Sequence, residues 1–262
     1  MKDTQISTLS KKTYTHTILD AINVDIEVTD NPYQLLLEDL FTMAARINKK
    51  RSFLFVSKVL GKHLPIHPQK GLLAAALLAA RYAESIKGLN VQAKEKIVRT
   101  FGQKELQFQS GAFISNSVNP VVIGFAETAT ALGHAFFDCF EKGEYFHTTR
   151  EEITSLTPCI TFEEEHSHAT SHRCYIPIDM INNDREIILV DDEMTTGKTA
   201  INIIESIHAR FPRDEYSVVS ILDWRSEENK RRFTELERKL GITINIVSLI
   251  SGKVQVEESG KL

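Results

Sequence analysis

The chain has 262 residues, of which 42% are hydrophobic and 25% are charged, and its formal net charge is -4. This composition is typical of a globular protein with a sizeable core, and the acidic balance argues against a surface built mainly for nucleic acid. The longest aliphatic run, Leu72–Ala80, is too short to span a bilayer, and the first residues lack the apolar segment of a signal peptide. The three cysteines match no zinc-binding spacing, so we expect reduced thiols in a cytoplasmic protein.

The first hundred residues carry strand and helix patterns in turn. Apolar residues alternate with polar ones from Ile22 to Val28, which predicts a strand. Residues 31–50 then predict a helix, with Asn31 at the N-cap and Pro32 at the first helical position. A short apolar strand over residues 52–60 and a second helix over residues 69–87 follow. We expect residues 1–110 to form a mostly helical, hood-like N-terminal subdomain.

From about Val118 strands alternate with helices to the end of the chain. Strands are predicted over residues 119–124, 144–150, 171–178, 186–192, 216–224 and 242–250. Helices are predicted over residues 127–140, 196–211 and 226–241, the last closed by Gly241. This alternation predicts an α/β fold with a doubly wound, mainly parallel sheet in residues 111–262.

The segment from Asp191 to Thr199 carries the strongest functional pattern. It ends in Gly-Lys-Thr like a nucleotide-binding P-loop, but that motif requires glycine where Asp192 stands. Two adjacent carboxylates at the end of a buried strand suit instead a vicinal diol or a hydrated Mg²⁺. A threonine-rich helix start beside them suits a single phosphate. A ribose 5-phosphate has this layout.

The segment resembles the motif by which type I phosphoribosyltransferases bind 5-phosphoribosyl 1-diphosphate (PRPP). That resemblance implies an Mg²⁺-dependent enzyme that moves ribose 5-phosphate to a base-like acceptor and releases pyrophosphate. It assigns Asp191 and Asp192 to the ribose hydroxyls and to Mg²⁺, directly or through water, as the catalytic pair. The 5-phosphate is assigned to Thr195, Thr196, Gly197, Lys198 and Thr199. The sequence departs from the family at Glu193, where an apolar residue is usual, and at Thr195, where the 6-oxopurine enzymes carry an aspartate.

Two further segments resemble pyrophosphate-binding parts of the same family. The turn after the strand at residues 119–124 would face the diphosphate through Ala126, Glu127 and Thr128, although a purely structural turn is the alternative. Members of the family often carry a strained peptide there. The long acidic stretch from Glu151 to Ser171 corresponds to a mobile lid. Its diphosphate contacts would come from Arg150, His166 and His168, unless these histidines are solvated or join His172 at a metal.

Residues 40–83 contain no acidic side chain and many basic ones, concentrated over residues 46–63. Three explanations compete: a solvated face, an RNA-binding surface, and an element over the diphosphate of PRPP, which we favour. The element would act through Arg51, Lys58 and Lys62. After the strand at residues 216–224, Trp224 would stack on the acceptor or pack in the core.

Several segments, among them "KRSFLFVSKVLGKHLP", "GFAETATALG" and "LVDDEMTTGKT", resemble a phosphoribosyltransferase branch associated with bacterial tellurite-resistance and stress gene clusters. This finer resemblance implies a nucleoside-like product and a C-terminal domain that is either absent here or separately encoded as a partner, while the type I family in general implies a homodimer. Two other functions stay open: a non-catalytic PRPP sensor on the same fold, and an RNA-binding protein that uses residues 40–83.

Overall fold

The computed structural model describes residues 12–47, 51–103, 107–163 and 171–258. Seven strands form the central sheet in the order β1-β2-β11-β10-β9-β5-β6. The five strands from β11 to β6 are parallel, whereas β1 and β2 are antiparallel additions at one edge. The parallel strands are β5 (Val121–Gly124), β6 (Glu144–His147), β9 (Ile187–Met194), β10 (Glu215–Asp223) and β11 (Thr243–Glu258). The mainly parallel α/β sheet predicted from the sequence is confirmed.

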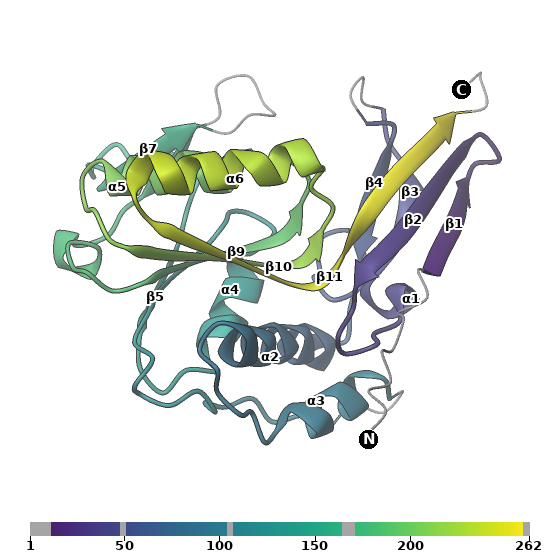
Figure 1. The fold of residues 1–262 in the computed structure, drawn as a ribbon, viewed down its shortest axis with the longest axis horizontal. Coiled ribbons are helices and arrows are strands. Elements are labelled where there is room, and N and C mark those ends of the chain that lie inside the picture. Colours follow the sequence, from purple (N-terminus) through teal and green to yellow (C-terminus); the bar gives the residue numbers. More distant parts are fainter. Residues whose placement is uncertain (1–11, 48–50, 104–106, 164–170, 259–262) are drawn as a thin grey trace, which may run out of the picture.

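Helices cover both faces of this sheet, as Figure 1 shows. One face carries α2 (Pro68–Ser85) and α4 (Thr130–Phe137), with α3 (Lys94–Phe101) packed on α2. The other face carries α5 (Lys198–His208) and α6 (Glu227–Leu240). The helix α2 is buried along most of its length, from Leu73 to Ala83, which its run of alanine and leucine allows. No helix among these described residues combines the length and the apolar character needed to cross a membrane.

The strand β11 has two halves with different partners. Its first half pairs with β10, and its second half pairs with β2 (Ile22–Asp30), which in turn pairs with β1 (Lys12–Ile18). The register shifts between Ser251 and Gly252. A Cβ on Gly252 would lie 2.3 Å from the carbonyl oxygen of Glu27, so only glycine permits this close crossing. N-terminal residues therefore extend the main sheet as well as supplying helices.

Residues 31–50 do not form the single helix that their pattern predicts. The helix α1 spans only Leu37–Leu40, and the chain then enters the strand β3 (Phe41–Ala45), which pairs with β4 (Phe53–Ser57). Asn31 bonds the backbone of Leu35 through both its oxygen and its nitrogen, which makes a turn rather than a helix start. Pairing with β4 buries Phe41 against other aromatic rings, and this gain overrides the helix propensity of the segment.

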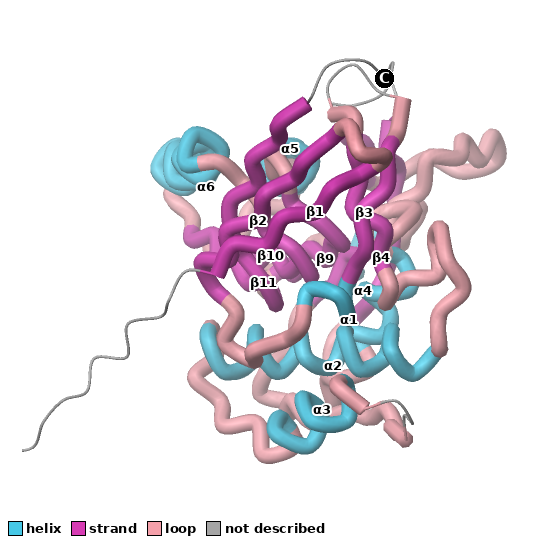
Figure 2. The backbone as a smooth tube through the Cα atoms, turned by 90° about the vertical axis from the view of Figure 1, so that its right-hand side faces the viewer, coloured by secondary structure: helices cyan, strands magenta, loops and turns pink. Residues whose placement is uncertain are grey.

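The β3–β4 hairpin stands beside β1 and β2, as Figure 2 shows, and forms a two-stranded sheet of its own. A second hairpin joins β7 (Ile160–Glu163) to β8 (Ser171–Cys174), followed by a short 3-10 helix at Ile178–Met180. The lid predicted over residues 151–171 thus contains a strand. One hydrophobic cluster includes Val24, Leu77, Val122 and Val219, so the core crosses the expected boundary at residue 110, and that boundary stays a prediction.

Candidate active site

The carboxyl end of β9 gathers three acidic residues at the middle of the sheet. The strand begins with four fully buried apolar residues, and Asp191, Asp192 and Glu193 follow them before Met194 ends it. Oδ1 of Asp191 accepts a 2.9 Å hydrogen bond from the backbone N–H of Asp192. Burial and the neighbouring charge of Asp192 raise the pKa of Asp191 well above its usual range. Crowded carboxylates of this kind favour a bound cation or a set of hydroxyl donors.

The residues predicted to hold the 5-phosphate form one turn and the start of α5. Thr195, Thr196 and Gly197 lie in the turn, and Lys198 and Thr199 open the helix. Gly197 is left-handed, with φ of 72°, and Oγ1 of Thr196 accepts a 3.3 Å hydrogen bond from the N–H of Lys198. This turn aims the amino end of α5 at the space beyond β9, where a helix favours an anion.

The loop after β5 lies next to the acidic end of β9. Gly124 pairs with Val190, and the N–H of Phe125 donates to the carbonyl of Val190 at 3.1 Å. The peptide bond between Ala126 and Glu127 is cis. Nζ of Lys62 donates a 2.6 Å hydrogen bond to Oγ1 of Thr128. Adjacent parallel strands thus bring the predicted diphosphate loop and the predicted ribose-binding carboxylates to one edge of the sheet.

A buried polar chain supports this loop from behind. The N–H of Ala126 donates to Oγ1 of Thr148 at 2.9 Å, and that hydroxyl lies 3.0 Å from Nδ1 of His172 on β8. His172 is 1% exposed and stacks on Phe162 of β7. The β7–β8 hairpin is therefore connected to the loop after β5 through His172, whose packing role the sequence did not predict.

The basic residues 51, 58 and 62 do not gather at one anion site. Of the three, Lys62 contacts the loop after β5, at Thr128. Nζ of Lys58 donates instead to the carbonyl of Glu38 at 2.8 Å, and Arg51 pairs with Glu193 at 2.8 Å. Other cations of residues 40–83 have acidic partners from outside that span. Lys70 lies 3.6 Å from Asp39, and Arg81 lies 3.1 Å from Asp30.

The remaining predicted lid residues contribute less to the described site. Arg150 is exposed, and its carbonyl accepts a 3.2 Å hydrogen bond from Arg173. His166 and His168 lie outside the described residues. Within the described part of the chain, no group of three or more acidic, histidine or cysteine side chains is arranged to hold a metal ion.

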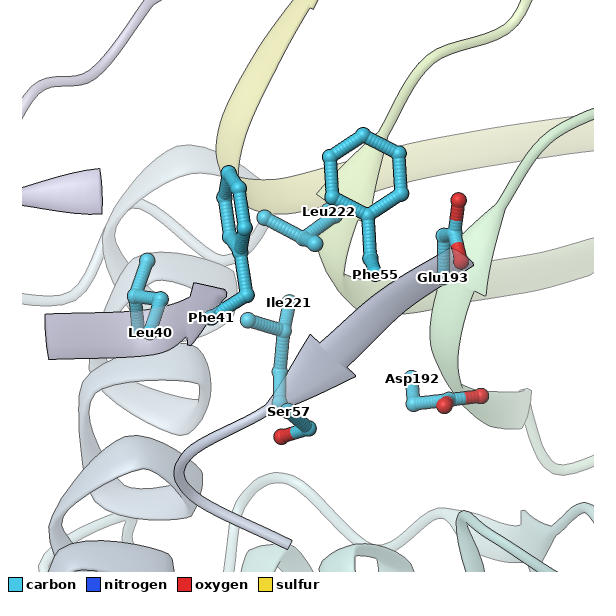
Figure 3. Close-up of a pocket in the computed structure, with 8 residues that line it drawn as sticks. All are labelled: Leu40, Phe41, Phe55, Ser57, Asp192, Glu193, Ile221 and Leu222. Atoms are coloured by element: carbon cyan, nitrogen blue, oxygen red, sulfur yellow. The ribbon is translucent and has the colours of Figure 1, made fainter. Parts of the chain in front are cut away.

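A narrow pocket lies between the β3–β4 hairpin and the carboxyl ends of β9 and β10. We call it the hairpin pocket, and Figure 3 shows its lining: Leu40, Phe41, Phe55, Ser57, Asp192, Glu193, Ile221 and Leu222. Its cavity volume is only about 10 Å³, room for a single water. Neither Phe41 nor Phe55 was predicted as a site residue, and Phe41 lies in a strand where the sequence pattern predicts a helix. A second, mainly apolar cavity of about 270 Å³ lies beside Lys62, Glu127 and Thr128.

Glu193 connects the hairpin to the acidic end of β9. Its Oε1 accepts a 2.8 Å hydrogen bond from Arg51, whose guanidinium lies 4.6 Å from the ring centre of Phe53 and 5.1 Å from that of Phe55. Burial raises the pKa of Glu193 to about 7, although Arg51 acts in the opposite direction. The acidic residue in a usually apolar position therefore has a specific partner 142 residues away in the chain.

Trp224 lies behind the hairpin pocket rather than in its lining. Its ring stacks on Phe55 at 5.3 Å with an interplanar angle of 23°, and its backbone N–H donates a 2.8 Å hydrogen bond to the carbonyl of Met194. The residue is 8% exposed, and its buried Nε1 has no hydrogen-bond partner among the described residues. Trp224 thus supports the wall of the pocket that Phe55 forms.

Comparison with known proteins finds one matching family model and several similar solved structures. A family model described as phosphoribosyl transferase matches residues 40–253. Similar solved structures include adenine phosphoribosyltransferases from Trypanosoma brucei (TM-score 0.48, 8% identity, covering 86% of this chain and 82% of that one) and Thermoanaerobacter pseudethanolicus (0.48, 12%, 81% and 96%). Another is the enzyme from Leishmania donovani (0.45, 14%, 86% and 83%). A search of curated proteins finds no match.

Proposed function

The chain belongs to the phosphoribosyl transferase family, and on that premise we propose that it transfers ribose 5-phosphate from Mg²⁺–PRPP to a base-like acceptor and releases pyrophosphate. One observation carries the proposal. The carboxylates of Asp191 and Asp192 are followed at once by the left-handed turn at Gly197 and by the amino end of α5. The carboxylates that would accept hydrogen bonds from the ribose hydroxyls therefore lie one turn away from the helix start that would bind the phosphate. Both lie at the edge of the sheet where such folds bind ligands.

Magnesium fits the donors at this edge. Asp191 and Asp192 supply the hard oxygen ligands that Mg²⁺ prefers, and the pKa of Asp191 is raised first by burial and then by the neighbouring charge of Asp192, which a bound cation would offset. We propose that these two residues hold the ion, directly or through water. When bound, Mg²⁺ would compensate the charge that develops on the departing diphosphate.

The side chains of the protein position the reactants in this proposal. Thr195 to Thr199 bind the 5-phosphate, while Ala126, Glu127 and Thr128, with Lys62 beside them, face the diphosphate. The bond from the anomeric carbon to the diphosphate oxygen breaks, and its electron pair leaves with pyrophosphate. A nitrogen of the acceptor then bonds that carbon.

We propose that the acceptor binds in the hairpin pocket, next to Asp192. The pocket is too small for a heterocycle in this structure, so the β3–β4 hairpin has to move away from the sheet when the acceptor enters. The hairpin has no backbone pairing to the seven-stranded sheet within the described residues, which favours such a movement. Trp224 would then act on the acceptor indirectly, through its stacking on Phe55.

The acidic pair gives the direct test. Asp191→Asn combined with Asp192→Asn should weaken Mg²⁺–PRPP binding by more than about tenfold, because amide groups hold Mg²⁺ and hydroxyl donors more weakly than carboxylates. Titration calorimetry measures this affinity. Asp179→Asn with Asp184→Asn makes the same charge change at two exposed residues before β9 and should leave the affinity unchanged. Equal affinity of both double variants and the wild type would rule out the assignment.

Finer features stay predictions. The relation to the tellurite-resistance branch, a nucleoside-like product, a role in nucleotide metabolism, a homodimer and a cytoplasmic location follow from the resemblance and the composition described above. A pyrophosphate-release screen with PRPP, Mg²⁺ and a set of heterocycles would identify the acceptor. Growth of a deletion strain on tellurite would test the branch.

A further inference from the structure

The polar atoms of the hairpin pocket have a definite chemistry. Three of the lining residues are polar, namely Ser57, Asp192 and Glu193, and none of the lining residues is basic. Glu193 comes from β9, and Ser57 ends β4 on the opposite side of the pocket (Figure 3). The pocket therefore offers two carboxylates and one hydroxyl to whatever enters it.

Ser57 is arranged to donate a hydrogen bond. Its Oγ already accepts hydrogen bonds from the backbone N–H groups of Val59 at 3.2 Å and of Leu60 at 3.1 Å. Because its lone pairs are directed to these amides, the hydroxyl hydrogen is the group that remains for a ligand. A ligand atom that faces Ser57 should therefore carry a lone pair.

Oε2 of Glu193 is arranged to accept a hydrogen bond. Arg51 donates to Oε1, whereas none of the described residues donates to Oε2. Arg51 stacks on Phe53 and Phe55, which orients the guanidinium that bonds Oε1. A ligand atom that faces Oε2 should therefore carry a proton.

The charge of the pocket excludes one class of acceptor. The cation nearest to Glu193, Arg51, is already bound to it through Oε1, and Asp192 is the residue proposed to hold Mg²⁺, so Glu193 is the carboxylate that faces the acceptor. An acceptor with its own carboxylate would face this negative charge in a partly buried site, where like charges repel strongly. The rings of Phe41 and Phe55, with Ile221 and Leu222, give the pocket an apolar lining that a planar ring would contact once the hairpin has moved away from the sheet.

We infer that Glu193 and Ser57 select a neutral, planar nitrogen heterocycle, with an N–H donor toward Glu193 and a lone pair toward Ser57, against carboxylate-bearing heterocycles. The inference rests on the proposed function and specifies its acceptor class. Glu193, the departure from the family pattern, becomes the residue that determines this specificity.

Matched acceptors test the inference. Pyrophosphate release from Mg²⁺–PRPP is measured with adenine and with two pairs, uracil against orotate and nicotinamide against nicotinate, at about pH 8 and low ionic strength. The wild type should use at least one neutral compound and prefer the neutral member of its pair in kcat/KM by about tenfold or more.

Glu193→Gln keeps the size and a bond to Arg51 but removes the charge, so it should reduce this preference about tenfold. Glu228→Gln, on the exposed face of α6, should leave it unchanged.

The outcomes separate the two proposals. A wild type that prefers orotate or nicotinate, or that uses none of the neutral compounds, contradicts the inference, as does a preference that survives Glu193→Gln. Calorimetry with Mg²⁺–PRPP alone runs beside these assays, because failure to bind PRPP would reject the proposed function itself. Should Glu193→Gln fail to fold, the preference of the wild type still decides the question.

Discussion

Gly197 belongs to the turn of residues 195–197 before α5, which is proposed to bind the 5-phosphate and is called here the phosphate turn. It adopts φ of 72°, and a Cβ built on it would lie 2.5 Å from a ring carbon of Phe233 and 3.2 Å from Cδ of Arg225. Glycine is therefore required twice, for the left-handed backbone and for the close packing of α6 behind the turn. The motif in the sequence contains this glycine, but the second requirement is visible only in the packing.

Replacing Gly197 by alanine should harm both stability and PRPP binding. Gly241 is the matched control, since it has a similar φ of 68° but no atom within 4 Å of an added Cβ. Gly241→Ala should cost about 1 kcal/mol of unfolding free energy and leave PRPP affinity intact. Gly197→Ala should cost more and weaken PRPP binding about tenfold or more, because the clash shifts the phosphate turn. Urea unfolding and calorimetry measure the two effects, and equal behaviour of the two variants would refute this explanation.

At the scale of the elements, a buried ion pair lies at the end of β10, next to the turn before α5. Arg225 donates from Nε and from one terminal nitrogen to the two oxygens of Asp223, at 2.9 and 2.7 Å, and both side chains are nearly inaccessible. The guanidinium also lies 4.5 Å from the ring centre of Phe233 on α6. One side chain therefore holds β10, α6 and the turn before α5 together.

Removing Arg225 should be far more costly than removing an exposed arginine. Arg225→Ala leaves the carboxylate of Asp223 buried without its partner and should lower the unfolding free energy by about 3 kcal/mol or more. Arg232→Ala removes a surface pair with Glu228 and should cost under about 1 kcal/mol. Urea denaturation followed by circular dichroism gives both values. A loss of the same size in both variants would mean that the buried pair contributes no more than a surface pair.

At the scale of the whole molecule, the N-terminal strands and the parallel sheet share a core. Trp224, the single tryptophan, sits where β10 ends and the β3–β4 hairpin packs. The cluster that contains it also includes residues of α2, β2 and β11. This continuity favours one cooperative unit rather than a hood that unfolds separately from the sheet.

Two probes of unfolding test that expectation. Fluorescence of Trp224 reports on the hairpin junction, and circular dichroism reports on the helices around the sheet. In urea the two transitions should coincide, because one core connects the two regions. Midpoints that differ beyond experimental error would show that the hairpin and its strands open before the sheet does, and would support a separate N-terminal subdomain.

The sequence alone predicted the mainly parallel sheet and drew attention to the acidic end of β9 and the threonine-rich start of α5, which are proposed to bind ribose and phosphate. These features are local: an apolar run marks a buried strand, and the residues that follow it carry their chemistry in a few consecutive positions. The resemblance to type I phosphoribosyltransferases implied that the loop after β5 shares a site with these segments, and the structure places that loop beside the end of β9.

Only the tertiary structure determined how the N-terminal residues expected to form a hood fold and pack against the sheet. Residues 41–45 have a helical pattern but become a strand because pairing with β4 buries Phe41, and Trp224 turns inward because Phe55 covers it. Arg51 is bound to Glu193 rather than standing free for the diphosphate. Each of these outcomes depends on contacts between residues far apart in the chain, and local propensity contains no information about such contacts.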